Sequence, residues 1–281
     1  MNATPEVLPA PRPAKVLPEP SALALFGSVV RAEWTKLRSV RSTMWSLLVT
    51  VALVVGLGAL FCAARVARAD RLDAGELRNF DPTGFSMNGI FLAQLAIGVL
   101  GVLVISSEYA TGQIGSTLAA TPQRLVVLAG KVVVFLGVAF TVGLVACGTA
   151  FVVGQSILSQ KFATASFGDP GVLRAVLGGA TYLAVLGALG IGLGAILRRP
   201  AGAIAALVGL LLVLPILSNF LPSPWNDDIG KYLPLRAGNP IFHTGAVDST
   251  DLSRGVGFVV FCAYAVVALV VGAVFLDRRD A

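Results

Sequence analysis

A short polar insert, Glu108–Arg124, separates two long apolar runs of this sequence. It contains an acidic residue, a tyrosine, several hydroxyl side chains and turn-forming glycines, but no nucleophile beside a base. A compact hairpin of this composition is suited to pressing on a partner protein. The alternative is an ordinary polar loop, and the insert alone favours neither interpretation. The residues predicted to form the docking surface are Glu108, Tyr109, Gly112, Ile114, Ser116, Thr117, Leu118 and Ala119.

The local order of residues in this insert predicts a helix end, a short helix and a restart. Gly112 suits the position just after a helix C-terminus. Residues 115–120 have room for one or two helical turns, which would place Leu118 and Ala119 on an exposed apolar patch. Lys131 follows, and we expect it at the membrane interface, ahead of the next apolar run.

Catalytic chemistry has no support in the sequence. There is no Gly-x-x-x-x-Gly-Lys-Ser/Thr phosphate loop, no His-Glu-x-x-His, and no pair of acidic residues within the apolar runs. His243 is the only histidine and has no second ligand near it, which argues against a metal centre or a catalytic triad. We therefore expect a chain that is not an enzyme, with no catalytic, cofactor-binding or metal-binding residue. The cysteines lie in apolar runs and are expected to be small buried packing residues: Cys62, Cys147 and Cys262.

The apolar runs also lack the groups that couple transport to ions. Apart from Arg174, near one end of the fourth run, they carry no charge. A proton or sodium relay normally uses ionisable side chains within the membrane. If this protein moves a substance, the energy must come from outside the chain, and the polar insert is the best candidate for the place where it is delivered.

The elements that position these residues follow from composition. Of the 281 residues, 56% are hydrophobic and 13% are charged, which is typical of a polytopic membrane protein. The apolar runs are continuous and not alternating, so we predict an all-α membrane protein in which each span needs about 20 residues. The six predicted transmembrane helices are Met44–Ala64, Asn88–Ser106, Val132–Leu158, Val172–Leu197, Ala201–Leu221 and Val256–Leu276.

Two segments precede the first span. Residues 1–21 are rich in proline and are predicted to be a disordered cytoplasmic arm. Residues 22–43 have an apolar and a polar side at helical spacing, which predicts an amphipathic helix in the membrane interface. Glu33 falls on the apolar side, where it either pairs with Lys36 at the surface or meets a polar partner in the bundle or a second subunit. The residues of interest in this helix are Glu33, Trp34, Lys36 and Arg38.

Several residues inside the spans predict how the helices pack. Gln94 is expected to bond a neighbouring helix in preference to a substrate. Gly190 and Gly194 have the spacing that lets helix backbones approach closely, either within the chain or in a dimer. Pro215 predicts a kink in the fifth span.

The segments between spans predict the topology. Arg65–Met87 is interpreted as a solvated connector. Pro222–Arg254 mixes prolines with apolar residues and is expected to form either short helical turns or a re-entrant segment folded back onto the membrane. A structured cap is favoured over an outer gate for the second segment. The basic pairs Arg198-Arg199 and Arg278-Arg279 favour an orientation with both termini in the cytoplasm. Residues 22–281 would then form one six-span domain.

Three regions carry a resemblance to a known family. They are Glu33-Trp34-Thr35-Lys36-Leu37-Arg38-Ser39; Ser107 to Gly112 followed by Ser116 to Pro122; and Tyr232-Leu233-Pro234 to Gly238 with the closing Arg278 to Ala281. In this order, around six spans, they resemble the membrane subunits of type-2 ABC transporters, in particular bacterial permeases whose ATPase is a separate polypeptide. The departures are Gln113, Gly115 and Gln123, which stand where Thr, Arg and Arg are common.

The resemblance implies an interfacial helix, a coupling hairpin over residues 107–124 and a plasma-membrane location. It also implies two partners: an ABC ATPase subunit that binds ATP and Mg²⁺, and a second permease copy or related paralogue. The implied direction is export, and spans without charge suit an amphiphilic or hydrophobic cargo such as a drug, peptide or lipid. The alternative function is a non-transporting membrane scaffold or sensor that docks an ATPase. Lipid is the expected surrounding, and no nucleic-acid partner is expected.

Overall fold

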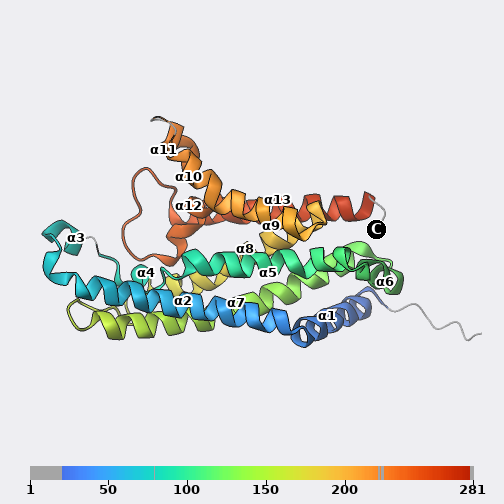
Figure 1. The fold of residues 1–281 in the computed structure, drawn as a ribbon, viewed down its shortest axis with the longest axis horizontal. Coiled ribbons are helices and arrows are strands. Elements are labelled where there is room, and N and C mark those ends of the chain that lie inside the picture. The colour runs from blue at the N-terminus through green and yellow to red at the C-terminus, as the bar shows by residue number, and fades with distance from the viewer. Residues whose placement is uncertain (1–20, 79, 221, 223–224, 279–281) are drawn as a thin grey trace, which may run out of the picture.

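The computed structural model describes the chain except for residues 1–20, 79, 221, 223–224 and 279–281. The predicted disordered arm, residues 1–21, therefore lies outside the described residues apart from Ser21. Within the described ranges the regular structure is helical, without strands, and six helices are long and apolar enough to cross a membrane, as predicted (Figure 1). These are α2 (Arg41–Ala67), α5 (Ile90–Ala110), α7 (Arg124–Leu158), α8 (Val172–Leu197), the continuous run α9–η2–α10 (Pro200–Ser218) and α13 (Arg254–Arg278).

Helix α8 forms the centre of the bundle. It packs against α5, α7 and α13, and 72% of its membrane-spanning stretch is buried, against 22% for α2 and for Pro200–Ser218. The close α5–α8 contact depends on glycine: a Cβ on Gly190 would collide with the carbonyl oxygen of Gly98, and one on Gly194 would lie 2.7 Å from that of Val102. The glycine pair therefore serves packing within the chain, which is the first of the two alternatives.

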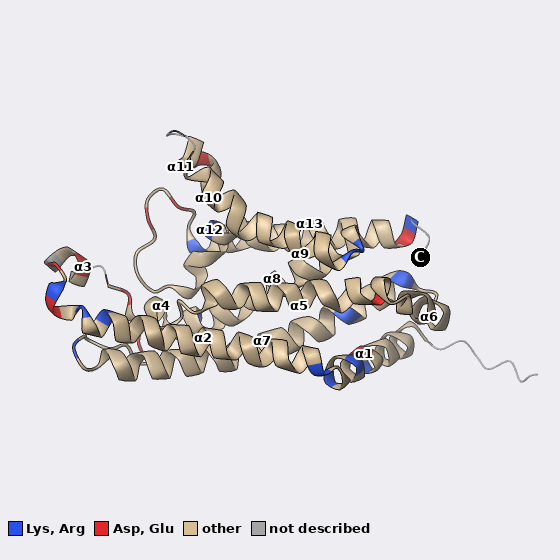
Figure 2. Ribbon diagram, viewed as in Figure 1, with Lys and Arg blue, Asp and Glu red and all other residues tan. Residues whose placement is uncertain are grey.

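The bundle has two different ends. The end that we call the α6 end carries α1 (Ala22–Ser39), α6 (Gln113–Ala120) and the last turn of α13, and the opposite end, the loop end, carries the connecting segments (Figure 1). Charged residues gather at both ends and are sparse between them (Figure 2). The segments of the loop end contain η1 (Ala69–Arg71), α3 (Ala74–Arg78), α4 (Pro82–Ser86), α11 (Trp225–Gly230), α12 (Pro234–Gly238) and η3 (Asn239–Phe242).

Two predictions about the segments next to the spans are wrong. The amphipathic helix does not run over residues 22–43, because α1 ends at Ser39 and Val40 takes an extended conformation before α2 begins. The interpretation of Arg65–Met87 as a solvated connector fails in its second half, where Ser86 and Met87 are fully buried. This half is drawn inward because α4 packs against α2 and α7.

The fifth span is irregular, as Pro215 predicts. Five residues, Gly209–Val213, form the π-helical turn η2, and α10 (Leu214–Ser218) continues from it. Proline has no backbone N–H and its ring collides with the carbonyl of the residue four positions earlier. A widened turn just before the proline relieves that collision, and π turns are a common site of helix kinks.

Candidate functional site

The hairpin at the α6 end forms from α5, α6 and the start of α7. Helix α5 ends at Ala110, and Gly112 reverses the chain with a φ of +72°, a conformation that favours glycine. Thr121 is extended, as expected of a residue before proline, and Arg124 opens α7. The predicted helix end and short helix are therefore both present.

Helix α6 turns its large apolar side chains inward. Ile114 and Leu118 are 5% and 9% exposed and pack with Val127 and Tyr109. The expectation that Leu118 belongs to an exposed patch is wrong, because residues four apart share one helix face and this face meets α7. The exposed residues of the predicted docking set are small: Gly112, Ser116 and Ala119 are exposed, whereas Thr117 and Tyr109 are half-buried and Glu108 is buried.

Four charged side chains meet behind the hairpin, and we call them the charge square. Lys131 of α7 lies 2.8 Å from Glu33 of α1 and 2.6 Å from Glu108 of α5. Lys36 of α1 lies 3.0 Å from each of the same two carboxylates. Three of the four are almost completely buried, and Lys36 is one-third exposed. The square joins three helices, with α6 connected to it through a 3.4 Å hydrogen bond from Lys36 to Thr117.

The charge square corrects two predictions. Glu33 does pair with Lys36, but it is buried in the bundle, so the interpretation with partners inside the protein is the better one. The spans are also not free of charge, because α5 extends to include Glu108 and α7 begins early enough to include Lys131. Burial lowers the pKa of Lys36, but the hydrogen bonds and charges of Glu33 and Glu108 outweigh that effect and leave the pKa raised. The ammonium group therefore stays charged at neutral pH.

Two arginines connect the hairpin to the end of α13. Arg124 donates a 2.8 Å hydrogen bond to the carbonyl oxygen of Leu276, and Arg198 donates one of 2.9 Å to that of Phe275. The guanidinium of Arg198 also lies 4.9 Å from the ring centre of Tyr109. Cations suit this position, because the last carbonyl groups of a helix have no partner within it.

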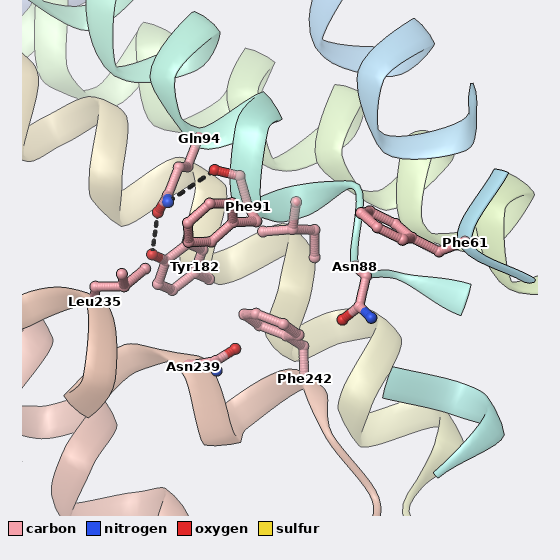
Figure 3. Close-up of a pocket in the computed structure, with 9 residues that line it drawn as sticks. Phe61, Asn88, Phe91, Gln94, Tyr182, Leu235, Asn239 and Phe242 are labelled. Atoms are coloured by element: carbon pink, nitrogen blue, oxygen red, sulfur yellow. Dashed lines mark hydrogen bonds between the residues drawn. The ribbon is translucent and has the colours of Figure 1, made fainter. Parts of the chain in front are cut away.

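A cavity of about 210 Å³ lies near the loop end. Figure 3 shows aromatic rings around it, with the amide of Gln94 between the hydroxyl of Tyr182 and the carbonyl of Phe91. Tyr182 donates a 2.5 Å hydrogen bond to Gln94, as predicted for a bond between helices. The cavity has no charged lining residue: it is lined by Phe61, Asn88, Ile90, Phe91, Gln94, Tyr182, Leu235, Asn239 and Phe242.

A second polar cluster, which we call the loop clamp, holds the segment after η3 against the bundle. Asp81 accepts hydrogen bonds from the Thr244 backbone N–H at 2.7 Å, the Thr244 hydroxyl at 2.5 Å and the Gly245 backbone N–H at 3.1 Å. Arg174 donates to the carbonyl oxygen of His243 at 2.8 Å, and Arg254 donates to that of Gly245. Desolvation raises the pKa of the Asp81 carboxyl, but hydrogen bonds from His243, Thr244 and the backbone outweigh it and lower the pKa well below its usual range.

The clamp also contains His243, the histidine for which the sequence offered no second metal ligand. His243 Nδ1 lies 3.4 Å from Asp81, and no group of three potential metal ligands occurs among the residues that the structure describes. Of the cysteines, Cys62 and Cys147 are buried, whereas Cys262 is half-buried.

Three features of these clusters were missed from the sequence. Lys131 was placed at the interface, although it shares a helix face with Val127 and Val134, which is a signal for burial. Tyr182 is the one aromatic residue of α8, a polar hydroxyl within a run of small residues that could have been matched to Gln94. The contact between Asp81 and Thr244 had no signal, because 163 positions separate them.

The comparisons with known proteins agree with this architecture. The sequence model of the family described as ABC-2 family transporter protein matches residues 29–218, which is more than half of the chain. No curated protein matches the sequence. Permeases of this family generally work with an ABC ATPase subunit. With six apolar helices and a match over most of them, the chain belongs to the ABC-2 family of transporter proteins and is a multi-pass membrane permease.

Proposed function

We propose that this permease exports an amphiphilic or hydrophobic cargo, such as a drug, peptide or lipid, and that a separate ABC ATPase drives it by docking on the α6 hairpin. The single observation that carries the proposal is the construction of the hairpin. Its tip presents small exposed residues, Gly112, Ser116 and Ala119, while the buried side chains of Ile114 and Leu118 anchor it from behind. A rigid, small-featured knob is suited to a socket on a partner.

The charge square would pass a movement of α6 to the spans. Thr117 on α6 bonds Lys36, which bonds Glu33 and Glu108, and both carboxylates bond Lys131. Each ammonium is shared between two carboxylates, so α1, α5 and α7 are held by contacts that can exchange partners when a helix slides. Small sliding of packed helices is a common way for transport domains to change state.

ATP and Mg²⁺ belong to the partner in this proposal, and the chain itself is not an enzyme. A second copy of the permease, or a related paralogue, completes the pathway in the plasma membrane, with both termini in the cytoplasm. The uncharged cavity near the loop end supports a cargo with apolar and aromatic parts and a few hydrogen-bonding groups, because Gln94, Asn88 and Asn239 are the polar groups that line it.

The decisive test is an arginine at the exposed tip. Ala119→Arg adds bulk and charge to the docking surface without touching the buried anchors, and we expect it to reduce co-purification with the ATPase at least tenfold. The matched control is Ala163→Arg, an exposed alanine in the segment between α7 and α8 at the loop end.

Equal co-purification of the two variants, both folded, would contradict docking on α6. If the wild-type permease binds the ATPase but no cargo stimulates ATPase activity, the result would instead favour a non-transporting scaffold or sensor. Cysteines introduced at Ser116 and Ala119 give a second measurement, because both should cross-link to the ATPase while one at position 163 should not.

A further inference from the structure

The outer side of α1 combines an apolar groove with basic residues. One hollow of about 510 Å³ lies between α1 and α7 and is lined by Val30, Trp34, Val133, Gly137 and Val142 among others. An adjoining hollow of about 300 Å³ shares Trp34 and Val138 with it and is bordered by Arg38. The two hollows form one groove, which we call the α1 groove, with Arg38 at its end.

The dimensions of the α1 groove suit a lipid chain. Val133 and Val142 are nine positions apart, which corresponds to about 14 Å along a helix. This is close to half of the roughly 30 Å hydrocarbon core, or the depth of one leaflet. Gly137 leaves space in the groove wall, because a Cβ built on it would meet no atom within 4 Å.

The charges beside the groove select the head group. Glu33 is the only acidic residue from Ala22 to Ala67, and it is buried in the charge square. The exposed charges of this region are therefore all positive: Arg31, Arg38 and Arg41. None of these three arginines forms an ion pair with another described residue.

We propose that the α1 groove is a binding site for an anionic phospholipid, with one acyl chain along α7 and the phosphate beside Arg38. Because Glu33 is buried in the charge square, the exposed charges of α1 are all basic. The charge square and the proposed lipid site therefore lie on two sides of the same helix, α1. Basic residues near a membrane surface contribute about 1 kcal/mol each to binding of acidic lipid, which is about fivefold in affinity.

The test uses the permease alone in detergent, so its outcome is independent of docking or transport. Native mass spectrometry would compare binding of phosphatidylglycerol and phosphatidylcholine to wild type, Arg38→Gln and Gly137→Leu. We expect Arg38→Gln to weaken the binding of phosphatidylglycerol about fivefold and to leave the binding of phosphatidylcholine unchanged. Gly137→Leu, which fills the groove, should weaken both lipids.

Two matched controls isolate the site. Arg71→Gln removes an exposed arginine at the loop end, and Gly148→Leu fills another open glycine position on α7, about three turns from Gly137 and outside the groove. Both should bind lipid as wild type does. Equal losses in Arg38→Gln and Arg71→Gln, or unchanged binding in Gly137→Leu, would overturn the proposal. A change of oligomeric mass in Gly137→Leu would also overturn it and assign the groove to a second copy.

Discussion

The charge square at the α6 end and the loop clamp at the opposite end hold the bundle in different ways. In the square, two ammonium groups and two carboxylates bond one another, and the groups come from three helices. In the clamp, one carboxylate, Asp81, accepts bonds from backbone N–H groups at the start of α4 and from two backbone N–H groups and a hydroxyl of the segment after η3. Three charges of the square are buried, whereas Asp81, Arg174 and Arg254 of the clamp are half-buried, and the two clusters also differ in what they connect.

We infer from this difference which end is able to move. Side chains that share partners can be rearranged when helices slide, whereas a carboxylate that satisfies consecutive backbone N–H groups fits one loop conformation. We therefore expect the clamp to fix the loop beside the cavity, and the square to leave α1, α5 and α7 adjustable beneath the hairpin. Four substitutions test the comparison.

The largest effect is expected from Lys131→Met. This change leaves Glu33 and Glu108 facing each other with Lys36 as the only cation, and breaking a buried pair typically costs about 3–5 kcal/mol. We expect a lower midpoint of thermal unfolding in detergent. The matched control is Lys161→Met, because Lys161 lies 2.7 Å from Asp70 in an exposed pair, where roughly 0–1 kcal/mol is expected. Equal shifts in the two variants would refute the importance of burial.

Asp81→Asn is expected to lower the free energy of unfolding by about 2–3 kcal/mol, a smaller loss, because an amide cannot replace a carboxylate that accepts several hydrogen bonds. The pKa of Asp81 is lowered in the folded state. The stabilisation that its carboxylate provides is therefore fully present above the pKa that Asp81 has in the unfolded chain, and it is lost only as the pH falls through the folded-state pKa. The difference from wild type in thermal unfolding should therefore be the same at pH 7 and pH 5.5.

The control for the clamp is Asp248→Asn, an exposed acid of the same loop that bonds only nearby residues. It should leave the unfolding midpoint unchanged. A loss of the Asp81→Asn effect already at pH 5.5 would show that the carboxyl is not held in its charged form by the clamp.

An intermediate effect of about 1–2 kcal/mol is expected from Tyr182→Phe, which removes the donor to Gln94 and leaves a buried amide oxygen without it. This bond lies between the two clusters along the bundle. Tyr232→Phe, at an exposed tyrosine of the loop end, is the control and should unfold as wild type. If Tyr182→Phe instead raises the unfolding midpoint, the Tyr182–Gln94 hydrogen bond does not stabilise the fold and would serve only to shape the cavity.

The smallest effect is expected from Lys36→Met. The Lys36 side chain is one-third exposed, so solvent screens its ion pairs. The free energy of unfolding is therefore expected to fall by about 1 kcal/mol. The variant should still slow transport if the square transmits movement from α6, because Thr117 loses its partner. Cargo-stimulated ATPase activity of the reconstituted complex would measure this. Unchanged stimulation would confine Lys36 to a structural role.

Much of the fold could be predicted because membrane spans are a local property. A continuous apolar run of about 20 residues indicates a span whatever its neighbours are, so the fourth span, Val172–Leu197, was predicted with its observed ends. The ends of α5 and α7 were not, because their helices continue through polar residues once those residues find partners. Glu108 and Lys131 form an ion pair, and neither run of sequence shows that by itself.

The residues predicted to dock a partner illustrate the same limit. Gly112 was predicted as a helix end because only local backbone geometry is involved. Leu118 was placed on the wrong side, because the periodicity of a short helix defines its faces but not which face meets the bundle. That choice is made by α7, through Val127.

The sequence by itself determined that this chain is an all-helical membrane protein with six spans, a hairpin between the second and third, and no phosphate loop of its own. These properties depend on composition and on spacings of a few residues. Only the tertiary structure decided which charges are buried, because Glu33, Glu108 and Lys131 come from three different helices. A charge can leave water only when an opposite charge meets it there, and that meeting is a property of the assembled bundle.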